Sequence, residues 1–111
     1  MLGIFNRRKL KEVLEKEMRI ARRYARPLAL IMFDIDHFKK VNDTYGHDTG
    51  DAVLLQVSNI VKRILRDTDQ FFRYGGEEFL VLAPETALAP GVSIAEKIRK
   101  SIEAETFPGT G

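Results

Sequence analysis

The 111-residue sequence contains no cysteine and no tryptophan, and it has no long hydrophobic run. The absence of cysteine excludes disulfides, zinc–thiolate sites and cysteine nucleophiles, and it fits a reducing compartment. No apolar stretch approaches the roughly 20 residues that a membrane-spanning helix needs, and the N-terminal residues become polar too soon for a signal peptide. With 44% hydrophobic and 31% charged residues, the sequence predicts one folded domain rather than a disordered chain.

The small net charge of +2 hides an uneven distribution of charged residues. Residues 1–26 carry nine basic and three acidic side chains, whereas the remainder carries nine basic and thirteen acidic ones. A basic segment can bind nucleic acid, but this one lacks interleaved aromatic residues and any nucleic-acid-binding motif. We favour the alternative of a solvent-exposed helix face, and we expect no nucleic-acid partner.

Hydrophobic periodicity predicts helices over residues 6–25, 50–66 and 91–104, and Gly46 would end a shorter helix over 37–45. An apolar run predicts a strand over 28–35, and two apolar runs that flank Gly75-Gly76 predict a hairpin over 70–83. The strand is apolar on both faces, which is typical of a central strand covered on both sides. In the hairpin, Gly75-Gly76 fits a two-residue turn, and this turn would place Phe72 opposite Phe79. The fold class expected is an α/β (α+β) sandwich, with a central antiparallel or mixed sheet and flanking helices.

Acidic side chains lie where two predicted strands end or begin. Asp34 and Asp36 follow the first strand, and Glu77 and Glu78 follow the glycine turn. Carboxylates from two adjacent strands can hold Mg²⁺, and paired metal ions can activate a hydroxyl and stabilise a leaving pyrophosphate. The backbone amides of residues 37–39 would open a helix, which can bind phosphate. The alternative is that these carboxylates are solvated loop ends.

Residues Gly75-Gly76-Glu77-Glu78-Phe79 resemble the signature of the GGDEF family, in the variant with Glu at the third position. Three further segments resemble the family's pattern in the same order: Asn6-Arg7-Arg8, Asp34-Ile35-Asp36-His37-Phe38-Lys39, and Asn42-Asp43-Thr44-Tyr45-Gly46-His47 with Gly50-Asp51. Four segments in order are far more specific than the five-residue signature by itself. The resemblance covers nearly the whole chain and implies a palm-like nucleotidyl cyclase fold.

The resemblance implies a diguanylate cyclase, which condenses two GTP molecules into cyclic di-GMP and releases two pyrophosphates. Such an enzyme would use Mg²⁺ or Mn²⁺, and it would act as a homodimer because each domain holds one GTP. The resemblance also implies the bacterial cytoplasm. A membrane would be involved only through an upstream sensor, of which this domain would form the cytosolic part.

Residue roles are carried over by matching positions. The resemblance implies that Asp34, Glu77 and the carbonyl of Ile35 bind the metal, and that Glu78 supports the metal site or assists deprotonation of the 3′-hydroxyl. Asp34, Glu77 and Glu78 would be the catalytic residues. The substrate would be bound by a larger set, in which Asn42 and Asp51 read guanine and the others lie near the phosphates: Asn42, Asp51, His37, Phe38, Lys39, Gly75 and Gly76. Without the resemblance, Asn42 would be interpreted as a helix-surface residue and Asp51 as a charge near a helix N-terminus.

Five residues separate a second motif, Arg66-Asp67-Thr68-Asp69, from Gly75. The resemblance implies an inhibitory site for the product cyclic di-GMP at Arg66 and Asp69. An Arg guanidinium can bind phosphate as a fork or stack on guanine, and a carboxylate can accept the N–H groups of guanine. The alternative is a basic helix end followed by a capping Asp.

The family pattern continues into a further strand, a helix and a basic K-x-x-G-R-N segment that residues 1–111 do not contain. We therefore expect a single partial GGDEF domain over 1–111, with an exposed sheet edge, lowered stability and little activity by itself. The competing hypothesis is a catalytically inactive module that binds GTP or cyclic di-GMP and regulates a partner. The presence of both glycines and of Asp34, Glu77 and Glu78 favours an enzyme.

Overall fold

The computed structural model describes residues 7–35, 38–73 and 78–104. Of the predicted site residues, His37, Gly75, Gly76 and Glu77 lie outside these ranges, as do the side chains of Phe38 and Lys39. None of the helices in the described ranges is both long and apolar enough to cross a bilayer.

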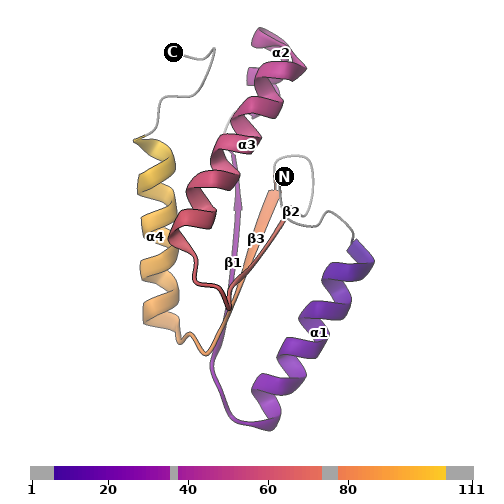
Figure 1. Ribbon diagram of the computed structural model, residues 1–111, viewed down its shortest axis with the longest axis vertical. Helices are drawn as coiled ribbons and strands as arrows, with labels where there is room; N and C mark the ends of the chain where they lie inside the picture. Colours follow the sequence, from indigo (N-terminus) through magenta and orange to yellow (C-terminus); the bar gives the residue numbers. More distant parts are fainter. Residues whose placement is uncertain (1–6, 36–37, 74–77, 105–111) are drawn as a thin grey trace.

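Four helices and three strands form the described fold (Figure 1). In chain order they are α1 (Arg7–Arg23), β1 (Leu28–Asp34), α2 (Phe38–Tyr45), α3 (His47–Ile64), β2 (Gln70–Arg73), β3 (Glu78–Pro84) and α4 (Leu88–Glu103). The strands form an antiparallel sheet in the order β1-β3-β2. Helix α1 covers one face of the sheet, and α3 and α4 cover the other (Figure 1). The α+β class expected from the sequence is confirmed, and every pair among the described strands is antiparallel.

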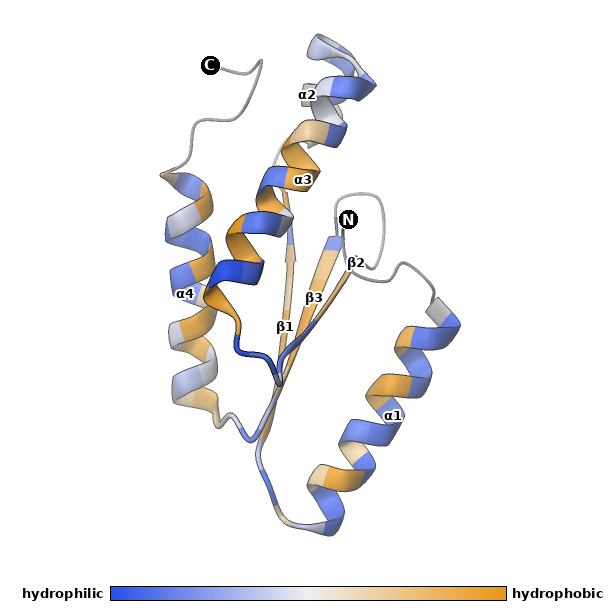
Figure 2. Ribbon diagram, in the orientation of Figure 1, coloured by the Kyte–Doolittle hydropathy of each residue, from blue (hydrophilic) through white to orange (hydrophobic). Residues whose placement is uncertain are grey.

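The face of the sheet under α1 carries a small apolar cluster. The apolar residues of α1 recur every three to four positions and so form one stripe on the helix (Figure 2). This stripe packs against the even-numbered residues of β2 and β3, and the cluster contains Leu10, Val13, Leu14, Phe72, Leu80 and Leu82. Burial of this stripe accounts for the position of α1.

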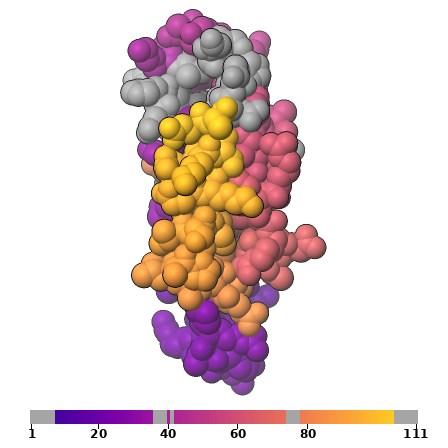
Figure 3. Space-filling model, turned by 90° about the vertical axis from the view of Figure 1, so that its left-hand side faces the viewer, coloured from indigo at the N-terminus to yellow at the C-terminus, as the bar shows by residue number. Residues whose placement is uncertain are grey.

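The opposite face carries the main core, which α3 and α4 cover side by side (Figure 3). The buried residues of this cluster come from both helices and two strands: Ile31, Val53, Val57, Val61, Val81 and Ile98. Three stacked rings extend it toward the end of β1, because Phe79 lies 5.3 Å from Phe33 and 5.5 Å from Phe71 between ring centroids. Each ring comes from a different strand, so the stack ties the three strands together on this face.

Helix α1 ends at Arg23, two residues before the predicted end at residue 25. The N–H of Arg26 donates to the carbonyl of Ala21 at 2.8 Å, and the N–H of Ala25 donates to the carbonyl of Arg22 at 3.4 Å. Ala25 adopts a left-handed conformation with φ of 52°. These bonds form a C-terminal cap that usually has glycine at the left-handed position.

Two helices begin earlier than the sequence predicts. Helix α3 begins at His47 rather than at residue 50, so Asp51 lies in its second turn and Asp48 in its first. Helix α4 begins at Leu88 rather than at residue 91, and it includes Pro90. Proline is tolerated in a first turn, where the backbone N–H has no helical partner. Pro90 therefore lies in the first turn of the helix and not in the connection before it.

The predicted hairpin register is wrong by one residue. Phe72 pairs with Leu80, and Arg73 pairs with Phe79. Five residues lie between the paired residues Arg73 and Phe79. A two-residue Gly-Gly turn would instead leave an even number of residues between any two paired residues of the hairpin. A shift of one residue moves a side chain to the other face of a sheet. Phe72 and Phe79 therefore lie on opposite faces instead of forming a cross-strand pair.

The prediction that the first strand is central is also wrong for the described sheet, in which β3 is the middle strand. Residues 79–83 of β3 are at most 3% exposed. In β1, by contrast, the side chains of Leu30 and Met32 are 46% and 60% exposed. An apolar pattern on both faces indicates what a strand could bury. It does not show that the cluster under α1 takes Phe72, Leu80 and Leu82 from β2 and β3 and only Leu28 from β1.

Candidate functional site

Two groups of polar side chains lie at opposite ends of β3. Asp34 and Glu78 lie where β1 ends and β3 begins, close to α2 and the start of α3 (Figure 1). Arg66, Asp69 and Thr86 lie at the other end, in the α3–β2 and β3–α4 connections. Six residue steps separate Glu78 from Pro84, which corresponds to about 20 Å of strand.

At the acidic end, Asp34 of β1 is the register partner of Glu78 of β3. Directly opposed residues of an antiparallel pair point to the same face, and both side chains are exposed. Carboxylate oxygens are the ligands that Mg²⁺ prefers, so this pair fits two of the ligands of a divalent cation. Within the described ranges, no three acidic or histidine side chains group closely enough to hold a metal ion. The predicted third carboxylate, Glu77, lies outside those ranges.

The acidic end rests on buried apolar residues. The side chain of Ile35, whose carbonyl is a predicted metal ligand, packs against the cluster of Leu54 and Phe79. Phe79 is fully buried and follows Glu78 directly. Phe79, the last residue of the Gly-Gly-Glu-Glu-Phe segment, therefore packs in the core and holds the neighbouring Glu78 at the start of β3.

The predicted guanine-binding residues lie on two packed helices, Asn42 on α2 and Asp51 on α3. Asn42 is half-buried and Asp51 is exposed. The carbonyl of Asn42 accepts from the N–H of Gly46 at 2.9 Å, and Gly46 has φ of 93°, a conformation that favours glycine. This turn sets the angle between α2 and α3. Phe38 and Lys39 are the first two residues of α2, as the predicted phosphate site requires.

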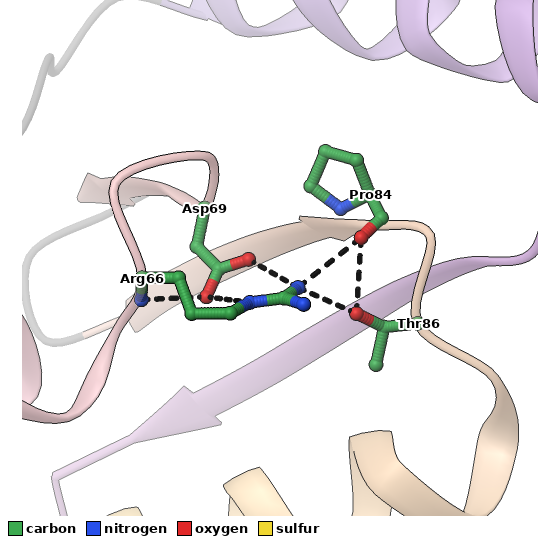
Figure 4. Close-up of polar contacts among 4 residues, drawn as sticks. All are labelled: Arg66, Asp69, Pro84 and Thr86. Carbon is green, nitrogen blue, oxygen red and sulfur yellow. Dashed lines mark hydrogen bonds and ion pairs between the residues drawn. The ribbon is translucent and has the colours of Figure 1, made fainter.

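At the other end of β3, the Arg66 guanidinium binds three residues (Figure 4). Its Nε donates to Oδ2 of Asp69 at 3.2 Å and its Nη2 donates to Oδ1 at 2.8 Å. The same Nη2 donates to Oγ1 of Thr86 at 2.7 Å and to the carbonyl of Pro84 at 3.1 Å. The Thr86 hydroxyl in turn donates to that carbonyl at 3.1 Å. The network joins the α3–β2 connection to the β3–α4 connection.

The two motif residues differ in exposure. The side chain of Asp69 is 1% exposed, whereas that of Arg66 is 51% exposed. The hydrogen bond and charge of Asp69 raise the pKa of Arg66 above its ordinary value, so the guanidinium is charged throughout the physiological range. Both Asp69 oxygens accept from Arg66, and Oδ2 also accepts from the Arg66 backbone N–H at 2.9 Å. Arg66 is thus the accessible member of the motif, and the buried Asp69 carboxylate is already hydrogen-bonded to it.

The sequence interpretation did not identify Thr86. It is 3% exposed and lies between the end of β3 and the first residue of α4. A single threonine after Pro84-Glu85 carries no signal by itself. Its contact with Arg66 depends on the left-handed backbone at Glu85, with φ of 54°, and on the fold that brings Arg66 next to it from twenty residues earlier in the sequence.

An apolar groove of about 530 Å³ runs between β1 and α4, and its lining includes Leu30, Met32, Leu88 and Val92. No charged residue lines it. Such a groove cannot neutralise a triphosphate, so the nucleotide is not expected there.

Known proteins resemble this chain over most of its length. The family model described as "Diguanylate cyclase, GGDEF domain" matches residues 1–110. Diguanylate cyclase A of Treponema denticola is 48% identical over 80 residues, which are 72% of this chain and 22% of that protein. The chain thus spans less than a quarter of that relative's length.

Two solved structures share the fold. The active GGEEF domain of a diguanylate cyclase from Vibrio cholerae has a TM-score of 0.88 and 35% identity, covering 95% of this chain and 67% of that one. The GGDEF domain of DgcB from Caulobacter crescentus, in complex with c-di-GMP, has a TM-score of 0.86 and 33% identity, covering 92% of this chain and 60% of that one. With a family match over residues 1–110 and this shared fold, the chain belongs to the GGDEF, diguanylate cyclase, domain family.

Proposed function

We propose that the whole protein containing this domain is a diguanylate cyclase, which condenses two GTP molecules into cyclic di-GMP and releases two pyrophosphates. The observation that carries the proposal is the register pairing of Asp34 with Glu78 at one end of the sheet, beside the first turn of α2. Membership of the GGDEF family supports it.

In this proposal, Asp34, Glu77 and the carbonyl of Ile35 hold Mg²⁺ or Mn²⁺. The metal would supply charge stabilisation at the phosphates and activation of the attacking hydroxyl. Glu78 supports the metal ligands or accepts the proton of the 3′-hydroxyl. Asn42 and Asp51 bind the guanine edge, because an amide and a carboxylate together match its acceptor and its N–H donors.

The phosphates would lie near the start of α2, at residues 37–39, and pass close to Gly75 and Gly76. One domain holds one GTP, so two domains must face each other, and we propose a homodimer as the active form. We further propose that the protein acts in the bacterial cytoplasm and reaches a membrane only through an upstream sensor.

The test is the full-length protein incubated with GTP and Mg²⁺, with cyclic di-GMP measured by chromatography. Asp34→Asn and Glu77→Gln should each lower the rate by at least about 100-fold, because each removes a metal ligand. Glu15→Gln, which changes an exposed carboxylate on α1, is the matched control. A wild-type protein that binds GTP but forms no product would favour the inactive regulatory module.

We also propose that cyclic di-GMP inhibits the enzyme at Arg66 and Asp69. The exposed, charged and hydrogen-bonded guanidinium of Arg66 supports this proposal, as does the c-di-GMP complex of the DgcB domain. Titration of product against initial rate should show inhibition, and Arg66→Ala should raise the inhibition constant by about tenfold or more. Absence of inhibition in the wild type would refute this part of the proposal while leaving the cyclase activity standing.

A further inference from the structure

The Thr86 hydroxyl lies where it can determine the orientation of Arg66. It accepts from Nη2 at 2.7 Å, the shortest bond of the guanidinium, and it donates to the Pro84 carbonyl at 3.1 Å. Thr86 is buried, so water cannot readily replace it. The hydroxyl therefore donates its proton to the Pro84 carbonyl at the end of β3 and accepts from Arg66 in the α3–β2 connection.

These hydrogen bonds hold the guanidinium through Nε and Nη2 and leave Nη1 out. Asp69 occupies the Nε–Nη2 edge as a fork, and Thr86 and Pro84 receive the remaining N–H of Nη2. Among the described residues, Nη1 has no hydrogen-bond partner. The Arg66 side chain is half exposed, and its Nη1 edge is the part that makes no hydrogen bond to the described residues.

A free arginine side chain loses considerable rotamer entropy when it binds a ligand. An arginine whose plane is already fixed loses less, and its open edge points in one direction before the ligand arrives. A phosphate or the acceptor edge of guanine could bind that open edge without disrupting the bonds to Asp69. Thr86 supplies part of this fixation from a different loop, twenty residues along the chain.

We propose that Thr86 is a positioning residue of the inhibitory site: its hydroxyl holds Arg66 in the orientation that receives cyclic di-GMP. This inference rests on the proposed product inhibition. Thr86 itself is not placed against the ligand, and it acts through Arg66.

The experiment measures the dissociation constant for cyclic di-GMP by calorimetry on the full-length protein freed of bound nucleotide. Thr86→Val keeps the shape and removes the hydroxyl, and it should weaken binding by roughly two- to tenfold. Thr86→Ser keeps the hydroxyl and should bind within about twofold of the wild type. Thr86→Ala removes the hydroxyl without adding bulk, and it replaces the valine variant if that variant does not fold.

A second readout separates positioning from a purely structural role. The ratio of the cyclic di-GMP inhibition constant to the KM for GTP should be higher in Thr86→Val than in the wild type. In Thr86→Ser this ratio should equal that of the wild type. A structural role would lower the melting temperature and kcat without changing that ratio. Wild-type affinity in folded Thr86→Val, or an equal loss in Thr86→Ser, would overturn the inference while product inhibition stands. A wild type that does not bind cyclic di-GMP would overturn both.

Discussion

Asp34 and Glu78 lie directly opposite each other across β1 and β3, with both side chains exposed. Like charges in this position destabilise an antiparallel pair. A divalent cation bound between the two carboxylates would replace their mutual repulsion with attraction to the cation. The stability of the protein should therefore depend on divalent cations through this pair.

Glu78→Gln should raise the free energy of unfolding by about 0.2–1 kcal/mol in the presence of a chelator at low ionic strength, because it removes the repulsion from Asp34. Urea unfolding measures this difference. Adding Mg²⁺ should stabilise the wild type more than the variant, and cyclic di-GMP formation should fall in Glu78→Gln. Glu15→Gln on α1 should show neither change. A destabilised Glu78→Gln without metal would contradict the interpretation.

Ser58 lies in α3 with a fully buried side chain, and its Oγ has no hydrogen-bond partner among the described residues. Burial of an unpaired hydroxyl costs free energy, so Ser58→Ala should stabilise the protein by up to about 1 kcal/mol in urea unfolding. Ser93→Ala on the exposed side of α4 is the matched control, since it reports the change in helix propensity alone. If Ser58→Ala is the less stabilising of the two, the hydroxyl has a partner in solution.

Ala25 closes α1 in a left-handed conformation, at a position that usually carries glycine. Ala25→Gly should raise the free energy of unfolding by up to about 1 kcal/mol, because glycine has no Cβ to strain this conformation. Ala25→Val should lower it, since a β-branched side chain is disfavoured at positive φ. Thermal unfolding of the two variants should thus shift in opposite directions, and equal shifts would contradict the cap.

Arg99 on α4 donates to Glu96 at 2.9 Å and to Glu103 at 2.7 Å. The hydrogen bond to Arg99, and then its charge, lower the pKa of Glu96 below the ordinary value of 4.5. This stabilisation is present above that ordinary value and is lost as the pH falls through the lowered pKa of the folded protein. Arg99→Gln should therefore lower the melting temperature more at about pH 7 than at about pH 3. An equal loss at both pH values would mean that Arg99 acts through packing alone.

The sequence was sufficient to predict each helix and strand, because the long helices carry an apolar stripe, the strands are apolar runs, and glycines mark the end of α2 and the connection between β2 and β3. It was also sufficient to place Asp34 and Glu78 at neighbouring strand ends. The register was not predictable, because Gly75-Gly76 fits a two-residue turn as well as a longer connection, and only the packing of Phe72 under α1 distinguishes them. The network of Arg66 and Thr86 was not predictable either, since it depends on two loops that meet only in the folded chain.

The buried middle strand, β3, sets the distance between the acidic end of the sheet at Glu78 and the Arg66 network at Pro84. Residues 79–83 are buried between helices on both faces of the sheet, and residues 79–82 are paired with strands on both sides. Their amide protons should be among the slowest in the domain to exchange with solvent. The separation of about 20 Å between Glu78 and Pro84 is therefore set by the most protected backbone of the fold. Insertions in the connecting loops would leave that separation unchanged, whereas a single deletion within β3 would shorten it and turn Glu78 away from Asp34.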